Sequence, residues 1–212
     1  MKLYTYFRSS AAFRVRIALN LKGLRYESLP KAFARNEHRA PDYLALNPQG
    51  LIPALAVDGV VLSQSLAIIE YLNDRHPAPP LLPDDPLDRA RVRSMALAIA
   101  CEIHPLNNLR VLNYLREELK QDDDGVGTWY RHWVSEGFRG LELQAREFSV
   151  EGRYCFGDAV SLADVLLVPQ MFNARRFKTD LTPFPTLVGI SAHLEALPAF
   201  AAARPEVQPD AQ

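Results

Sequence analysis

The chain has 212 residues, 48% hydrophobic and 23% charged, which is ordinary for a globular protein with one large or two small domains. Its net charge of −1 argues against nucleic-acid binding, which would need a concentrated basic face. There is no apolar run long enough to span a bilayer and no signal peptide, so we expect a cytoplasmic protein without a membrane partner. The cysteines and histidines lack metal-ligand spacing, so we expect no metal.

The first third of the chain alternates strand and helix patterns. Residues 2–6 have the period of a strand, and the helix that follows Ser9 and Ser10 ends near Gly23. Further expected elements are strands at 26–29, 52–57 and 60–62 and helices at 42–46 and 65–75. This order predicts a compact α/β domain with a mixed sheet over residues 1–80.

Five prolines between residues 77 and 86 mark a linker, which we place at residues 81–86. Only helical periods follow, so residues 87–212 are expected to form an all-helical domain. Residues 88–119 are expected to form one long helix or a kinked pair with the kink at Pro105, and further helices are expected at 127–148, 162–172 and 186–197. Ser161 and Asp164 form a capping box that opens the helix 162–172. The tail 203–212 is expected to lie over the surface.

Two helix starts in the first domain carry hydroxyls, at Ser9–Ser10 and at Gln64–Ser65. A helix N-terminus favours an anion, and a hydroxyl beside free amides can hold a thiolate. The two starts together could grip both ends of one anionic ligand, although each alone is more often an ordinary cap. On general frequencies the Ile52–Pro53 bond is expected to be trans.

Two polar groups stand out in the helical half. His104, Asn108 and Arg110 are spaced so that they can share a helix face, which indicates either a solvated face or the wall of a site. Arg175 and Arg176 close a helix, where they are either surface charges favoured by the helix dipole or a carboxylate anchor.

Six segments of the chain form a set that can be compared with known families. They are residues 9–19 (SSAAFRVRIAL), 47–55 (NPQGLIPAL), 64–72 (QSLAIIEYL), 104–110 (HPLNNLR), 168–177 (VPQMFNARRF) and the ending 208–210 (QPD). Together they resemble the zeta class of the glutathione S-transferase superfamily. One departure is Ala11, where the family usually has a cysteine. The resemblance covers the whole chain and implies a thioredoxin-like domain followed by the helical domain of a glutathione S-transferase.

The same resemblance implies glutathione as cofactor, a cis Ile52–Pro53 bond and a homodimer. Ser9 would stabilise the glutathione thiolate with help from Ser10, while Arg8 and Arg176, rather than Arg175, would hold the carboxylates of a small anionic substrate. The residues implied to bind glutathione are Ser9, Ser10, His38, Ile52, Gln64, Ser65, His104, Asn108 and Arg110.

Bacterial members of this class include maleylacetoacetate and maleylpyruvate isomerases. The resemblance therefore implies a glutathione-dependent cis–trans isomerase of a maleyl keto-diacid, with maleylacetoacetate preferred to maleylpyruvate. A transferase acting on α-haloacids would use the same site, and a non-catalytic binding protein of this fold is the alternative from another class. Both serines are present, which favours catalysis.

Overall fold

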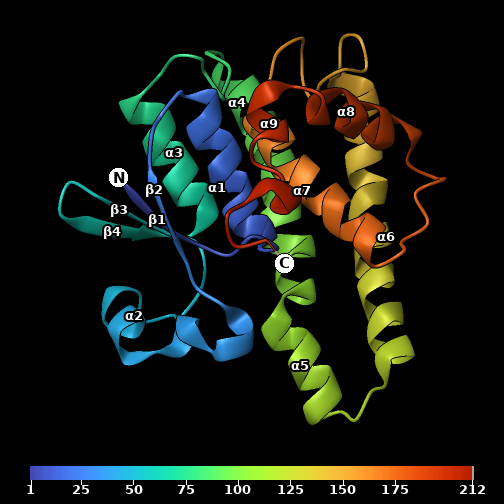
Figure 1. Cartoon of the computed structure of the whole chain (residues 1–212). Helices are drawn as coiled ribbons and strands as arrows, with labels where there is room; N and C mark the ends of the chain where they lie inside the picture. The colour runs from blue at the N-terminus through green and yellow to red at the C-terminus, as the bar shows by residue number, and fades with distance from the viewer. Residues whose placement is uncertain (212) are drawn as a thin grey trace. The chain divides into compact units, whose positions relative to one another are not determined.

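The computed structural model describes residues 1–211, which divide into two compact units (Figure 1). The first comprises residues 1–80 together with residues from 196 onward, and the second is Leu81–Glu195. Together they give a thioredoxin-like sheet domain and a helical domain, the fold class expected from the sequence. Within residues 1–211, no helix is both long and apolar enough to cross a membrane.

The first unit is built on a four-stranded mixed sheet in the order β2-β1-β3-β4. β1 runs parallel to β2 and antiparallel to β3, and β3 runs antiparallel to β4. The strands are β1 (Lys2–Thr5), β2 (Glu27–Pro30), β3 (Ala54–Val57) and β4 (Val60–Ser63). The helices are α1 (Ser10–Leu21), α2 (Pro41–Leu46), α3 (Ser65–Arg75) and the short α9 (Pro198–Ala201).

Helix α1 is the core of this unit. Ten consecutive residues, 10–19, are buried, and α1 packs against both α3 and α9 (Figure 1). Two of the ten are arginines, Arg14 and Arg16, each only 1% exposed. Buried charges need hydrogen-bonding partners, so these two side chains determine which segments α1 holds in place.

The expected boundary at the end of the chain needs correction. We expected the helical domain to run to residue 212, but residues from 196 onward are grouped with the first unit. The reason is a set of polar contacts: Arg16 Nε donates to the Ala203 carbonyl at 3.0 Å, and Asn20 Nδ2 donates to the Ala199 carbonyl at 2.9 Å. Residue 212 lies outside the described residues.

The second unit is entirely helical apart from one isolated bridge between Ser149 and Gly157, within the residues described. Its most buried element is α7, in which twelve of fifteen residues are buried. The helices are α4 (Pro86–Leu97), α5 (Leu109–Glu117), α6 (Asp123–Phe148), α7 (Leu162–Arg176) and α8 (Pro185–Glu195).

The segment 88–119, which we expected as one long helix or a kinked pair, is interrupted near Pro105. After α4 the chain continues as a π-helical segment, Ala98–Ile103, then as the 3₁₀ turn Pro105–Asn107, before α5 begins. Pro105 has no N–H to donate, so α-helical hydrogen bonding cannot continue through it, and the π-helical segment gives way to the 3₁₀ turn there. α6 comes very close to this segment at Gly137, where an added Cβ would lie 2.2 Å from Ile103 Cγ1.

Candidate active site

Four loops that carry predicted site residues begin or end at the same edge of the sheet. The register places Tyr4 of β1 opposite Ala54 of β3, and Ala54 opposite Ser63 of β4. Thr5 at the end of β1 likewise pairs with Pro30 at the end of β2. The Ser9 turn, the Ile52–Pro53 loop, the Gln64–Ser65 joint and the loop that leads to His38 therefore all leave this edge.

Ser9 is the N-cap of α1, as expected from the sequence. Its Oγ accepts the Ala12 N–H at 3.2 Å, and its backbone is extended (φ −68°, ψ 112°). A hydroxyl that accepts a hydrogen bond keeps its own hydrogen for donation. Ser10 is the first residue of the helix and is buried. The start of α1 therefore combines a donor hydroxyl with the positive end of a helix dipole.

The Ile52–Pro53 bond is cis, as the resemblance implies and against the general frequency. The preceding loop is held by a carbonyl that receives two side chains: the Tyr43 hydroxyl donates to Leu51 O at 2.6 Å and Asn47 Nδ2 donates to it at 2.8 Å. Ile52 and Pro53 are both buried. This loop is thus a fixed element directly before β3.

Gln64 and Ser65 differ from the expected capped start. Gln64 takes the N-cap position of α3 with φ +69°, a backbone conformation that costs about 1–3 kcal/mol in a non-glycine residue, and its side chain makes no capping bond. Its Nε2 instead donates to Gln49 Oε1 at 2.9 Å. The Ser65 hydroxyl does not cap the helix either, because it accepts from NH1 of the buried Arg14 at 3.3 Å. Arg14 thereby connects α1 with the start of α3.

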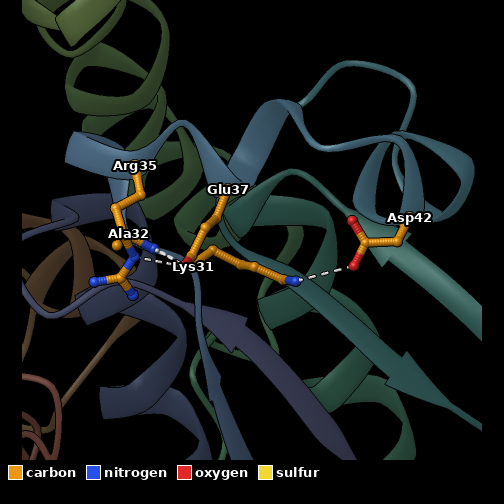
Figure 2. A network of polar contacts seen from close by, with 5 residues as sticks. All are labelled: Lys31, Ala32, Arg35, Glu37 and Asp42. Atoms are coloured by element: carbon orange, nitrogen blue, oxygen red, sulfur yellow. Dashed lines mark hydrogen bonds and ion pairs between the residues drawn. The ribbon is translucent and has the colours of Figure 1, made fainter.

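His38 lies in the loop between β2 and α2, which polar contacts hold in shape (Figure 2). The Glu37 carboxylate accepts the Ala32 N–H and the Arg35 Nε–H, both at 2.7 Å. Lys31 and Asp42 form a further ion pair at 3.5 Å across the same loop (Figure 2).

Within this loop the His38 ring packs edge-on against Phe33, with 4.5 Å between ring centroids. Burial and the neighbouring Arg39 lower the pKa of His38, which favours a neutral imidazole. Its Nδ1 is buried without a hydrogen-bond partner among the described residues. A buried polar atom of this kind can be satisfied by a ligand.

The predicted residues of the helical unit come from separate segments. His104 follows the π-helical segment, and Asn108 is the N-cap of α5, where its Oδ1 accepts the Arg110 N–H at 3.1 Å and the Val111 N–H at 3.4 Å. His104 and Asn108 are half-buried and Arg110 is exposed. Asn108 thus has a structural task in addition to any binding role.

The arginines at the end of α7 have different surroundings. Arg175 forms an ion pair with Glu195 and donates to Ser191 Oγ at 3.3 Å, both on α8. Arg176 is exposed and lies over the Phe177 ring, 4.8 Å from its centroid. In the first unit, Arg8 is exposed over the Phe7 ring at 4.9 Å. Arg8 and Arg176 are thus exposed arginines that each lie over the ring of a neighbouring phenylalanine, and Arg175 bonds to α8.

Sequence reasoning missed three residues that support these loops. Gln49 holds the Gln64 side chain, Arg14 holds the Ser65 hydroxyl, and Asp210 accepts the Phe7 N–H at 2.9 Å. Each contact joins segments far apart in the chain. All three residues lie inside segments that resemble the family: Arg14 in 9–19, Gln49 in 47–55 and Asp210 in 208–210.

A thioredoxin-like domain with a cis-proline directly before β3, followed in one chain by a helical domain, defines the glutathione S-transferase architecture. Residues 1–74 match the family model for the N-terminal domain of glutathione S-transferase. A probable maleylacetoacetate isomerase from Vibrio cholerae is 52% identical over 99% of this chain and 97% of its own length. The chain therefore belongs to the glutathione S-transferase family.

Two solved structures narrow the comparison. A holo structure of a maleyl pyruvate isomerase, described as a bacterial glutathione S-transferase of the zeta class, superposes with a TM-score of 0.98 at 46% identity and covers all of both chains. A maleylacetoacetate isomerase from Methylobacterium extorquens AM1, solved with malonate and glutathione bound, gives a TM-score of 0.95 at 42% identity, again over both full chains. The zeta class is thus the part of the family that this chain matches.

Proposed function

We propose that this protein is a glutathione-dependent cis–trans isomerase of a maleyl keto-diacid, with maleylacetoacetate as the preferred substrate and fumarylacetoacetate as the product. The observation that carries the proposal is the start of α1, where the Ser9 hydroxyl sits at a helix N-terminus, at the same end of the sheet as the cis-proline loop. That arrangement is suited to stabilising a thiolate. The names of the relatives point to the same reaction.

Several residues between 1 and 80, in the first unit, fit glutathione. The buried Nδ1 of His38 has no hydrogen-bond partner among the described residues and suits the glycyl end. Gln64 and Ser65, at the start of an eleven-residue helix, suit the γ-glutamyl carboxylate. We assign the backbone of Ile52 to the cysteinyl part of glutathione. His104, Asn108 and Arg110 would add further contacts to glutathione. The helical domain that begins at residue 87 would bind the substrate.

Bound glutathione would supply a thiol whose anion adds reversibly to the double bond, so that the former double bond becomes single, rotates and re-forms as trans with the thiol released unchanged. Ser9 would hold that anion by donating its hydroxyl, and Ser10 and nearby amides would assist. Arg8 and Arg176 would hold the substrate carboxylates and the charge that develops on the conjugated carbonyl, because a guanidinium binds carboxylates in a bidentate fork.

The energetic requirement is modest. A thiol begins near pKa 8.5, and lowering this by two units requires about 2.7 kcal/mol of preferential thiolate stabilisation. A hydrogen bond to a charged group supplies about 1.5–3 kcal/mol. The helix N-terminus adds about 0.3–1 kcal/mol. Ser9 and α1 together supply about 1.8–4 kcal/mol, a range that includes the requirement, so a cationic base is not needed.

The test is an assay of the purified protein on maleylacetoacetate and on maleylpyruvate, each with and without glutathione. We expect isomerisation only with glutathione, faster on maleylacetoacetate, and with the total glutathione unchanged at the end. Maleylpyruvate is the second candidate substrate, because the holo structure with a TM-score of 0.98 is that of a maleyl pyruvate isomerase. Faster turnover of maleylpyruvate would make it the preferred substrate. Stoichiometric consumption of glutathione with an α-haloacid and no isomerisation would contradict the proposal.

We further propose a cytoplasmic homodimer. A hollow of about 580 Å³ lies along α4 and contains none of the predicted site residues; it is lined by Pro86, Ala90, Arg93, Ser94, Leu97, Ala98 and Glu102. Leu97 there is 40% exposed, and Leu87 on the same helix is 59% exposed. Burying these leucines against a second copy would stabilise a dimer. Sedimentation equilibrium should give twice the chain mass, and Leu97→Asp should shift it to the monomer.

A further inference from the structure

The turn that presents Ser9 lies between β1 and α1. Within it, the Ser9 N–H donates to the Tyr6 carbonyl at 3.0 Å. Phe7 in the middle of the turn is buried, so its N–H and carbonyl need partners inside the protein. Those partners come from two side chains distant from the turn, Arg16 and Asp210.

Arg16 binds the turn from within α1. Its NH1 donates to Thr5 Oγ1 at 3.1 Å and to the Tyr6 carbonyl at 3.4 Å, and its NH2 donates to the Phe7 carbonyl at 3.0 Å. Its Nε donates at 3.0 Å to the carbonyl of Ala203 in the tail. Burial lowers the pKa of Arg16 to about 10, so the guanidinium remains charged at neutral pH. One buried cation thus connects the turn with the C-terminal segment.

Asp210 completes the connection from the tail. Its Oδ2 accepts the Phe7 N–H at 2.9 Å, across 203 positions in the sequence. Its charge also attracts Arg16. The Gln208 side chain folds the tail locally by donating to the carbonyls of Ala202 at 3.1 Å and Arg204 at 2.8 Å. The segment 203–210 is therefore held in one conformation while Asp210 contacts the turn.

We propose that the segment 203–210 is a positioning element of the active site, in which Asp210 and Arg16 fix the turn that aims the Ser9 hydroxyl at the glutathione sulfur. The inference rests on the proposed function, since it assigns a role relative to the bound thiol. Asp210 bonds the backbone of Phe7, two residues before Ser9, and does not contact the sulfur in this proposal. It is therefore a positioning residue and not a catalytic one. A loosened turn would let the hydroxyl move away from the sulfur.

The pKa of the bound thiol separates this role from a simple effect of charge. If Asp210 acted only through its negative charge, removing the charge would stabilise the thiolate and lower the pKa of the thiol. If Asp210 positions Ser9, removing it weakens a hydrogen bond to the thiolate and raises that pKa. The two accounts predict opposite signs.

The experiment compares Asp210→Ala and Asp210→Asn with the wild type by ultraviolet titration of the bound thiolate and by steady-state kinetics. For Asp210→Ala we expect a rise of about one pKa unit, a tenfold change in the ionisation equilibrium. We also expect a fall in kcat of about tenfold, within the range that small misplacements cause, with a smaller change in the KM for glutathione. Asp210→Asn keeps an oxygen acceptor for Phe7 and should remain close to the wild type.

Glu206→Ala is the matched control, because it removes an exposed carboxylate from the same tail and should leave both quantities unchanged. A lowered or unchanged thiol pKa in Asp210→Ala would overturn the proposal, even if urea denaturation showed reduced stability. So would a rise in Asp210→Asn equal to that in Asp210→Ala. If Asp210→Ala does not fold, Arg16→Lys must raise the thiol pKa, since lysine cannot serve the same four acceptors, and an unchanged value refutes the role. Wild-type protein that binds no glutathione would instead refute the proposed function.

Discussion

Replacing the two arginines that end α7 one at a time should affect different properties of the protein, activity for Arg176 and stability for Arg175. Arg176→Ala should reduce kcat/KM for the keto-diacid, because the exposed guanidinium is proposed to hold a substrate carboxylate. A hydrogen bond to a charged group contributes about 1.5–3 kcal/mol. At 1.36 kcal/mol for each factor of ten, the loss is about 10- to 150-fold. The KM for glutathione should change little.

Arg175→Ala is the matched control on the neighbouring position. Its ion pair with Glu195 involves side chains that are 39% and 19% exposed, and such pairs contribute at most about 1 kcal/mol to stability. We therefore expect a small fall in the urea midpoint and nearly unchanged kinetics. Adjacent residues of a helix point about 100° apart, so both cannot face one pocket. If Arg175→Ala is the variant that loses activity, or if neither does, the assignment of Arg176 fails.

Three further predictions concern single carboxyl or hydroxyl groups. Ser9→Ala should raise the pKa of the bound thiol by about one to two units, since it removes a charge-assisted hydrogen bond; an unchanged thiolate titration would remove Ser9 from its role. Asp164→Ala should destabilise the helical unit by at least about 2 kcal/mol, because it strands buried N–H groups of Cys155 and Ser161 that donate to Asp164 at 2.7 Å. Urea unfolding checks this, with the exposed Asp158→Ala expected to be nearly neutral. The hydrogen bonds that Glu37 accepts from the Ala32 N–H and from Arg35 lower the pKa of Glu37. The stability that Glu37 adds is therefore present above its unfolded pKa of 4.5 and is lost as pH falls through the lower folded value. The protection of the Ala32 amide against hydrogen exchange, relative to its intrinsic rate, should fall over that acidic range in the wild type but not in Glu37→Gln.

Local patterns predicted the elements well where one segment determines its own structure. Helix α3 has the expected bounds of residues 65–75, and the capping box of Ser161 and Asp164 is present at the start of α7. Ser9 caps α1 as its sequence indicates. In each case the signal lies within a few residues of the element, because a cap or a helical period is a local property.

Contacts between distant segments could not be predicted in this way. Nothing near Arg14 indicates that it reaches Ser65, and the Phe7 N–H finds its acceptor 203 positions away. The grouping of the tail with the first unit follows from such contacts, which explains why the expected boundary at residue 212 failed. The cis Ile52–Pro53 bond followed from resemblance alone, because general frequencies favour trans.

The contact between Asp210 and Phe7 has a consequence for how the protein is made. The sheet of the first unit and α1 are synthesised before the helical unit, whereas Ala203 and Asp210 are synthesised only after it. Until then, the Phe7 N–H and part of the Arg16 guanidinium lack their final acceptors. The Ser9 turn is therefore translated before the helical unit, yet it acquires its complete set of bonds only after Asp210 has been synthesised. A nascent chain interrupted before residue 203 would contain every strand of the sheet and still lack the finished turn.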